Sequence, residues 1–349
     1  MDPTRWNRLS LDWLQAACPH FQWSQAAESL SESLGEAWFA DTCPERPLRV
    51  LVGPPGSGIR RVLQELAEVR QLRLLPAPQA EEILASAPGD TALLRSAEPD
   101  AGEILVIPNL ECWYLRHPNG LALVRNLVEW LSGFRGRVLV GCDSWAWAFL
   151  QRAAGIEDLL GEPQTLASFN ARRLDAWFRD TLELPLPAFR QRGGAEAVFP
   201  LADDEGARPA GRAEGEVSSL IRSLAVRARG NPGVALALWR TSLRERETSD
   251  SAGASKVSGA EQAAGKDKAT ATETPPSTPS SDVWVVPSAK LDMPQFPADY
   301  DRIHRFVLHA LLLHGGLTLP LLAQLLPFAR HELQRRVRGL HRAGLLALP

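Results

Sequence analysis

The feature that most constrains the fold of this 349-residue chain is an apolar stretch that leads into a glycine-rich turn and then a helical pattern. "LRVLV" (48–52) precedes "GPPGSGIRR" (53–61), and "RVLQELAEVRQL" (61–72) follows. A strand, a glycine-rich turn and a helix in this order are the setting of a phosphate-binding loop, because backbone N–H groups at a helix N-terminus attract anions. The residues of the predicted loop are Gly53, Pro54, Pro55, Gly56, Ser57, Gly58, Ile59 and Arg60.

Two positions of this loop depart from the pattern G-x-x-x-x-G-K-[ST]. Ile59 stands where the lysine is expected, and Arg60 stands where a serine or threonine is expected. The lysine would place a cation on the β- and γ-phosphates, and an opposite-charge pair at 4 Å is worth about 4 kcal/mol at an effective dielectric near 20. The hydroxyl would ligate magnesium, which arginine cannot do. Bound ATP or ADP is therefore expected to be weakly held, and held without magnesium.

Apolar runs and helical patterns alternate after this loop. The runs are nearly continuous rather than alternating with polar residues, which is typical of parallel strands covered on both faces. The sequence therefore predicts an α/β fold with a doubly wound parallel sheet. The expected strands are 48–52, 72–76, 103–108, 137–141 and 163–169.

The chain divides into six predicted segments. Residues 246–282 contain one valine, no other large aliphatic residue and no aromatic residue, so they are expected to be too polar to fold. Three helical patterns at 299–316, 318–327 and 329–344, followed by "LLALP" (345–349) as a strand, are the pattern of a winged helix. The segments are a helical lead-in expected at the sheet edge (1–46), an α/β core (47–182), a loop or insertion (183–214), a helical lid (215–244), a disordered linker (245–297) and a winged-helix domain (298–349).

The ends of the third and fourth strands are the expected places for acidic catalytic groups. In "ILVIPNLE" (104–111), Pro108 stands where a magnesium-binding aspartate is expected, and Asn109 where a second acid is expected. Glu111 is the nearest carboxylate, and it serves either as a general base or in a solvated or structural role. Asp143 is either a polar sensor facing a γ-phosphate or an N-cap of the helix that follows it.

The loop 53–58, "ILVIPNLE", "RVLVGCDSW" and "TLASFNARRLDAWF" together resemble the AAA+ superfamily and its signalling branch, the STAND proteins. "RGNPGVALALW" (229–239) resembles the Gly-x-Pro turn of the helical lid in that branch, which puts Asn231 at a sensor-like position. The resemblance implies a P-loop NTPase fold with a helical lid and a C-terminal winged helix.

The last helix is rich in arginine. Residues 299–349 contain seven arginines and three acids. In many winged helices the third helix reads DNA, whereas in AAA+ and STAND proteins this domain often packs on the ATPase core or on a partner. The candidate contact residues for DNA or a partner are Arg330, Arg335, Arg336 and Arg338, within 329–344.

Composition gives little support to several kinds of partner and site. The net charge of −3 gives no global reason to expect nucleic acid or an anionic membrane as partner, and no apolar run approaches the roughly 18 residues of a membrane span. The four cysteines lack C-x-x-C spacing, so they are expected to be reduced thiols of a cytoplasmic protein without a metal site.

Three functions are consistent with these observations. The first is a regulatory or scaffolding module that binds a protein partner or itself, with little or no nucleotide hydrolysis, because the lysine and the magnesium ligands are missing. The second is an active ATP-dependent remodeller of a protein partner that uses Arg60 and Glu111 unconventionally. The third is a winged-helix DNA-binding regulator.

Overall fold

The computed structural model describes residues 6–7, 9, 11–40, 47–95, 103–192, 197–199, 217–246 and 283–347. The chain forms two compact units. One unit joins Met1–His20 to Phe169–Leu291, and the other joins Phe21–Ser168 to Asp292–Pro349. Both units are therefore assembled from segments that are far apart in the sequence.

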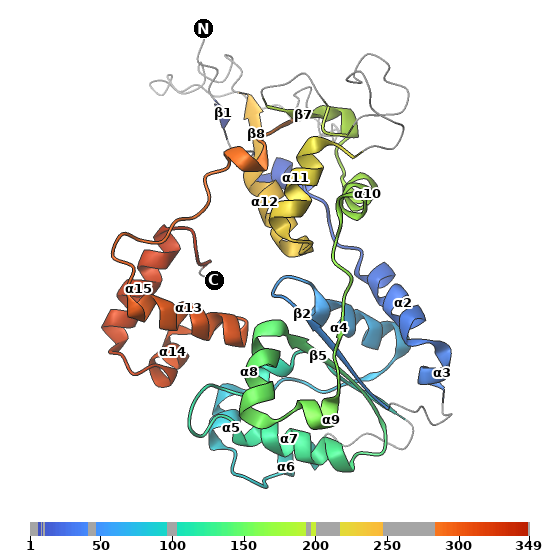
Figure 1. The fold of residues 1–349 in the computed structure, drawn as a ribbon, viewed down its shortest axis with the longest axis vertical. Coiled ribbons are helices and arrows are strands. Elements are labelled where there is room, and N and C mark those ends of the chain that lie inside the picture. The colour runs from blue at the N-terminus through green and yellow to red at the C-terminus, as the bar shows by residue number, and fades with distance from the viewer. Residues whose placement is uncertain are drawn as a thin grey trace, which may run out of the picture. The chain divides into compact units, whose positions relative to one another are not determined.

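The unit that contains the glycine-rich loop is built on a five-stranded sheet in which every neighbouring pair is parallel (Figure 1). The strand order is β3-β4-β5-β2-β6. This confirms the predicted parallel α/β sheet, although its edge strands are shorter than expected. The strands are β2 (Leu48–Gly53), β3 (Arg73–Leu74), β4 (Ile104–Ile107), β5 (Arg137–Asp143) and β6 (Gln164–Thr165).

Helices cover both faces of this sheet. Leu51 and Val106 face a core formed with α4 (Ile59–Arg70) and α2 (Trp23–Leu34), whereas Val50 and Leu105 face a core that includes α7 (Ala122–Gly133) and α8 (Ser144–Ala154). Parallel crossovers share one hand, so a connection toward one edge lies on the opposite face from connections toward the other edge. The remaining helical pieces are α3 (Glu36–Phe39), α5 (Ala80–Ala85), α6 (Ala92–Arg95), α9 (Glu157–Leu160) and the 3₁₀ turn η1 (Leu110–Cys112).

The position of α2 corrects one expectation. The lead-in was expected at the sheet edge, but α2 packs on α4, and its Ala27, Leu30 and Leu34 join the core on that face. Among the described strands of this sheet, only β2 is followed by a connection that runs toward the β3 edge, so α4 alone would leave part of its face uncovered. The apolar side chains of α2 cover the rest of this face.

Three helices complete this unit, as predicted: α13 (Arg302–His314), α14 (Leu319–Leu325) and α15 (Arg330–Arg342). The expected final strand is wrong for residues 345–347, which form none, and 348–349 lie outside the described residues. Leu345 N–H donates to Leu340 C=O, and the Leu345 and Leu346 side chains pack beside the small core of Val307, Leu333 and Leu340. The chain therefore closes the end of α15 instead of pairing in a ladder.

The other unit contains a small mixed sheet in the order β1-β8-β9-β7. The predicted linker is wrong at both ends, because β8 and β9 belong to this sheet; residues 247–282 lie outside the described residues. Alternation in "VWV" places Val283 and Val285 in the core, which is why this stretch pairs as a strand. The strands are β1 (Trp6–Asn7), β7 (Phe189–Gln191), β8 (Leu243–Arg246) and β9 (Val283–Val285).

Helices pack around an aromatic core in this unit. Trp239 lies 4.8 Å from Phe178 and 5.7 Å from Phe189, measured between ring centroids. Its indole N–H donates to Ala17 C=O at 2.8 Å, which fixes the N-terminal segment. The helical elements are α1 (Leu11–Ala16), α10 (Ala171–Thr181), α11 (Ser219–Ala228), α12 (Pro232–Ser242) and the 3₁₀ turns η2 (Leu186–Ala188) and η4 (Ser288–Lys290).

Candidate functional site

The glycine-rich loop has the backbone that its sequence predicts. Gly56 and Gly58 have φ of 83° and 86°, in the left-handed region that glycine adopts at little cost. Ser57 N–H donates to Pro54 C=O at 3.0 Å, and α4 begins directly after Gly58. The loop therefore turns tightly between β2 and the N-terminus of α4.

Ile59 is directed into the apolar core beneath the loop. Its side chain is 6% exposed and belongs to the core between the sheet and α4. A Cβ built on Gly53 would come within 2.7 Å of Ile59 Cδ1, and one built on Gly141 within 3.0 Å of Ile59 Cγ2. The residue in the lysine position thus fills the space between the loop and β5 with methyl groups.

An aromatic ring covers Gly58. A Cβ built on Gly58 would come within 2.7 and 2.9 Å of two carbons of the Trp23 ring, and Trp23 stacks on Phe21 at 4.6 Å. Trp23 is the first residue of α2, 35 positions before Gly58, and no sequence signal connects the two. The loop is consequently packed by Ile59 from within and by Trp23 at its junction with α4.

Glu111 and Asp143 meet at the carboxyl ends of β4 and β5. Glu111 Oε2 accepts a hydrogen bond from Asp143 N–H at 3.2 Å. Burial raises the pKa of Glu111, the Asp143 charge adds to this, and hydrogen bonds from the backbone together with the Arg60 cation oppose it. Burial also raises the pKa of Asp143 to about 6, against the opposing effect of backbone N–H groups of Trp145 and Ser144. Arg60 and Asp143 therefore each lie within electrostatic reach of Glu111.

Asp143 caps α8, as one of its two predicted roles requires. Its carboxylate accepts a hydrogen bond from Trp145 N–H at 3.2 Å. The role as a γ-phosphate sensor stays a prediction. Glu111 likewise has an observed structural contact, the bond to Asp143 N–H, and its role as a general base stays a prediction.

The end of β4 presents backbone where a magnesium ligand is expected. The Pro108 carbonyl lies against Gly141, since a Cβ there would come within 2.6 Å of the Pro108 oxygen. Asn109 is 3% exposed. In the part of the chain that the structure describes, no three His, Cys, Asp or Glu side chains gather in an arrangement that would hold a metal ion.

Asn231 belongs to the other unit and caps α12. Its side-chain oxygen accepts hydrogen bonds from Gly233 N–H at 3.0 Å and Val234 N–H at 3.2 Å. Pro232 follows as the first helical residue, which is the favoured place for proline. The sensor-like role of Asn231 stays a prediction beside this observed capping.

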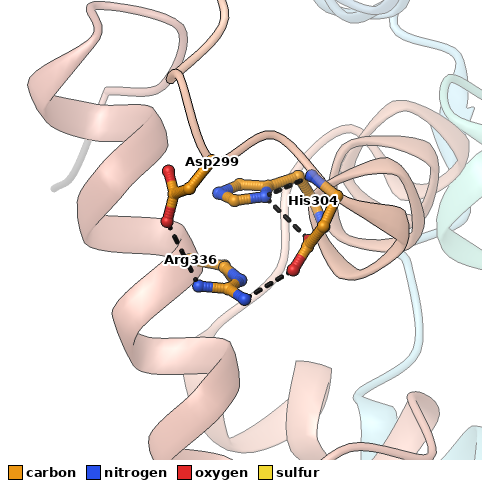
Figure 2. Close-up of polar contacts among 4 residues, drawn as sticks. Asp299, His304 and Arg336 are labelled. Atoms are coloured by element: carbon orange, nitrogen blue, oxygen red, sulfur yellow. Dashed lines mark hydrogen bonds and ion pairs between the residues drawn. The ribbon is translucent and has the colours of Figure 1, made fainter.

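Arg336 differs from the other arginines proposed to contact DNA or a partner. Its guanidinium forms ion pairs with Asp299 at 3.4 Å and Asp301 at 2.5 Å (Figure 2). Asp301 also accepts from His304 N–H as the N-cap of α13, so this network ties α15 to the start of α13. Arg330, Arg335 and Arg338 are exposed on α15. Arg336 thus has an observed role inside the fold, and its role as a contact residue stays a prediction.

The loop after η1 holds the end of α13, and this was not predicted. The Tyr114 hydroxyl donates to Leu313 C=O at 3.2 Å, Arg116 N–H donates to His314 Nε2 at 3.4 Å, and the Tyr114 and His314 rings lie 4.9 Å apart. The Tyr114 bond satisfies a carbonyl in the last turn of α13, which has no partner within the helix. The contact joins residues about 200 positions apart, so no local pattern reveals it.

Comparison with known proteins identifies no family. No protein-family model matches the chain, and no curated protein matches it significantly. The fold is thus assigned from the structure as α/β with a five-stranded parallel sheet, a small mixed sheet and C-terminal helices.

The described helices are short compared with a membrane span. None of these helices is long and apolar enough by itself to cross a membrane. The pair α13 and α14, which is bent by 108°, passes the length and composition criteria only when the two helices are taken together.

Proposed function

We propose that this chain is an AAA+/STAND-like P-loop protein that acts as a regulatory or scaffolding module for a protein partner or for itself. One support is the position of its loop. β2 leads through α4 toward the β3 edge, whereas β5 leads through α8 toward the β6 edge. Adjacent parallel strands whose connections diverge leave a ligand crevice at their carboxyl ends. The glycine-rich loop and Asp143 follow these two strands.

The observation that carries the proposal of a degenerate site is the burial of Ile59. A lysine at this position would direct an ammonium group toward the β- and γ-phosphates. Ile59 instead packs against Gly53 and Gly141 in the apolar core. The loop retains N–H groups at the start of α4 as its attraction for phosphate, and Arg60 is the nearest cation in sequence. Nucleotide binding is accordingly weak or absent.

The proposal also accounts for the end of β4. Magnesium needs oxygen ligands in a near-octahedral arrangement. Arg60 and Pro108 occupy the two positions from which the family supplies them. Binding of nucleotide is therefore expected to be indifferent to magnesium, and hydrolysis is expected to be undetectable.

Calorimetric titration of the full chain with ATP and with ADP, each with and without magnesium, tests this proposal. We expect weak or absent binding that magnesium changes by less than twofold. Phosphate release in the presence of magnesium is expected to equal that of a blank. Tight magnesium-dependent binding or measurable turnover would contradict the proposal.

A double variant tests whether the missing groups explain the behaviour. Ile59→Lys with Arg60→Thr is expected to tighten ATP binding at least tenfold and to make it magnesium-dependent. Hydrolysis should stay absent, because Pro108 and Asn109 remain. Arg61→Thr is the matched control, since Arg61 is the next residue of α4 and its side chain is 53% exposed. Equal affinities of the double variant and the control would show that the loop does not bind nucleotide.

A second candidate is an active ATP-dependent remodeller, and the cluster of Arg60, Glu111 and Asp143 favours it. A buried carboxylate with a raised pKa is a common feature of acid–base sites. If Glu111 is the base, the wild type releases phosphate and Glu111→Gln does not, while both bind ATP equally. Absence of release from the wild type excludes this function.

A third candidate is DNA binding through α15, favoured by the exposure of Arg330, Arg335 and Arg338. Binding through phosphate contacts weakens steeply with salt. A duplex DNA mobility shift that disappears between 50 and 200 mM salt, and that the three Arg→Gln changes abolish, would support it. If the triple variant shifted DNA as the wild type does, the DNA-binding surface would not be α15.

A further inference from the structure

A cavity of about 180 Å³ lies where α13, the end of α14 and the loop after η1 come together. Three basic side chains line it: Arg116, His309 and His314. The other five lining residues are apolar and come from α13 and from 325–327. No acidic side chain is part of the lining, so the cavity combines apolar walls with a positively charged end.

The polar groups of this lining are arranged to donate hydrogen bonds. Arg116 Nη1 lies 2.9 Å from His309 Nδ1, and because arginine has no acceptor, Nδ1 must accept. Burial, and next the Arg116 charge, lower the pKa of His309, so its ring is neutral at pH 7 and carries its hydrogen on Nε2. The remaining N–H groups of Arg116 are donors as well.

The hydrogen bonds of His314 fix its tautomer in the same way. Its Nε2 accepts from Arg116 N–H, so the hydrogen of the neutral ring is on Nδ1. Burial lowers the pKa of His314 to about 4, and the Glu111 backbone offsets part of this effect. Nδ1 is buried and has no hydrogen-bond partner of ordinary geometry among the described residues. Arg116 and His309 thus offer donors to the cavity, and none of the three basic side chains has a free acceptor.

We propose that this cavity binds a small carboxylate with a short apolar chain. An acceptor-only, negatively charged group complements Arg116 and His309, and a carboxylate fits the planar donors of a guanidinium. The apolar wall formed by Phe306 and Ala310 of α13 and by 325–327 suits a hydrocarbon chain. Since a water molecule occupies about 30 Å³ in the liquid, the cavity has room for about six heavy atoms. Butyrate has this size.

A ligand in this cavity would affect how the C-terminal helices are held by the loop after η1. The side chain of Arg116 holds His309, and its backbone N–H holds His314, both from α13. A carboxylate on the Arg116 guanidinium would bridge the loop after η1 and α13. Its binding is therefore expected to stabilise the contact between this loop and the C-terminal helices.

Calorimetric titration of the full chain at pH 7.5 tests the proposal with sodium butyrate, butyramide and inorganic phosphate as probes. Butyrate should bind saturably, and butyramide, which has the same size but no charge, should bind at least tenfold more weakly. Phosphate should bind more weakly than butyrate because it has no apolar part. A stronger response to phosphate, or equal responses to butyrate and butyramide, would overturn the assignment.

Two variants locate the site. Arg116→Gln should weaken butyrate binding at least tenfold, and Arg116 is an exposed residue whose replacement leaves the core intact. Arg338→Gln, an exposed arginine of α15, is the matched control and should change nothing. Ala310→Leu should abolish binding by filling the cavity. Absence of saturable butyrate binding to the wild type, or unchanged binding by Arg116→Gln, would overturn the proposal even if Ala310→Leu fails to fold.

Discussion

Gly58 shows at the scale of one residue how the loop depends on packing as well as on backbone freedom. Its φ of 86° is costly for any residue with a Cβ, and the Trp23 ring occupies the place of that Cβ. A sequence pattern explains the first requirement, because glycine is the usual residue in the left-handed region. The second requirement comes from α2 and is visible only in the folded chain.

We predict that Gly58→Ala destabilises the protein. The left-handed backbone costs an alanine about 1–2 kcal/mol, and displacement of Trp23 adds to this cost. Urea unfolding measures the change. Gly133→Ala is the control, since Gly133 lies in α7 with open space around its Cβ position, and this change should be neutral or stabilising by up to about 1 kcal/mol.

A third change, Trp23→Ala, distinguishes the two causes. Trp23→Ala in the Gly58→Ala background should recover the part of the loss due to the clash, but not the part due to φ. If Gly58→Ala were as stable as the wild type, the loop would have to adopt another backbone than the one described.

Asp143 provides a prediction of pH dependence. Its folded-state pKa is about 6, above its ordinary value of 3.8. The stability that a group with a raised pKa contributes is complete below its ordinary pKa and is lost as the pH rises through the folded-state pKa. Asp143→Asn keeps an N-cap, because asparagine caps as well as aspartate, but removes this titration.

The Asp143→Asn variant should therefore match the wild type in stability near pH 4 and exceed it at pH 7.5. Thermal unfolding at both values measures the difference. Asp158→Asn, which changes a carboxylate in the first turn of α9, is the control and should show no such rise. A variant that is less stable than the wild type at pH 7.5 would indicate that the charge of Asp143 is favourable in the fold.

At the scale of elements, α13 and α15 are joined by charge as well as by their small apolar core. Burial alone would raise the pKa of Asp301, but hydrogen bonds from His304 and Arg336, together with the Arg336 charge, lower it to about 2. A lowered pKa contributes stability above the ordinary value of 3.8, and this stability is lost as the pH falls toward 2. The network shown in Figure 2 is therefore expected to weaken in acid.

We predict that Arg336→Ala lowers the stability of the protein by about 1–3 kcal/mol at pH 7, since hydrogen bonds to charged groups are lost and a partly buried carboxylate is left with fewer partners. The effect should shrink as the pH falls from 4 to 2. Chemical unfolding measures it, with Arg335→Ala as the control because Arg335 is the exposed neighbour. Equal effects of the two changes would contradict the assignment of Arg336 to an internal network.

At the scale of the whole molecule, the two units share the chain in an interleaved way. β9 follows residues 247–282 in sequence, yet it pairs with β7 and β8, which precede them. α13 follows as well, and it contacts Tyr114 and Arg116 of the α/β core. Both units are consequently completed by the C-terminal part of the chain.

We predict that a chain cleaved at a protease site engineered within 247–282 stays a single particle. The two fragments should elute together from a size-exclusion column, because β9 and α13 keep their partners on the N-terminal fragment. Residues 1–246 expressed alone should be insoluble or aggregate, because they lack β9, which pairs with β7 and β8, and α13, which packs against Tyr114. Separation of the nicked fragments without denaturant would show that these pairings are weaker than the structure implies.

Much of the fold and part of the site could be predicted from local patterns. The apolar runs predicted the five parallel strands, and the spacing of glycines predicted the loop before α4. Capping was one of the two roles predicted for Asp143, because a preferred capping residue stands directly before a helical pattern. The missing lysine at Ile59 was also visible. These features depend on backbone preferences and on neighbours within a few residues, so a short stretch of sequence is enough to predict them.

Other features were decided only by the tertiary structure. The inward packing of Ile59 depends on Gly53 and Gly141, the covering of Gly58 depends on Trp23, and the seat of His314 depends on a loop about 200 residues away. The missing strand after α15 and the pairing of β1 with β8 depend equally on which segments happen to be neighbours. Periodicity predicts which face of a helix or strand is apolar, but it does not predict which other segment packs against that face. The sequence by itself determined the strands and helices of the α/β core and the chemistry of the loop. The order of the sheet, with the contacts that it brings together, determined what surrounds that loop.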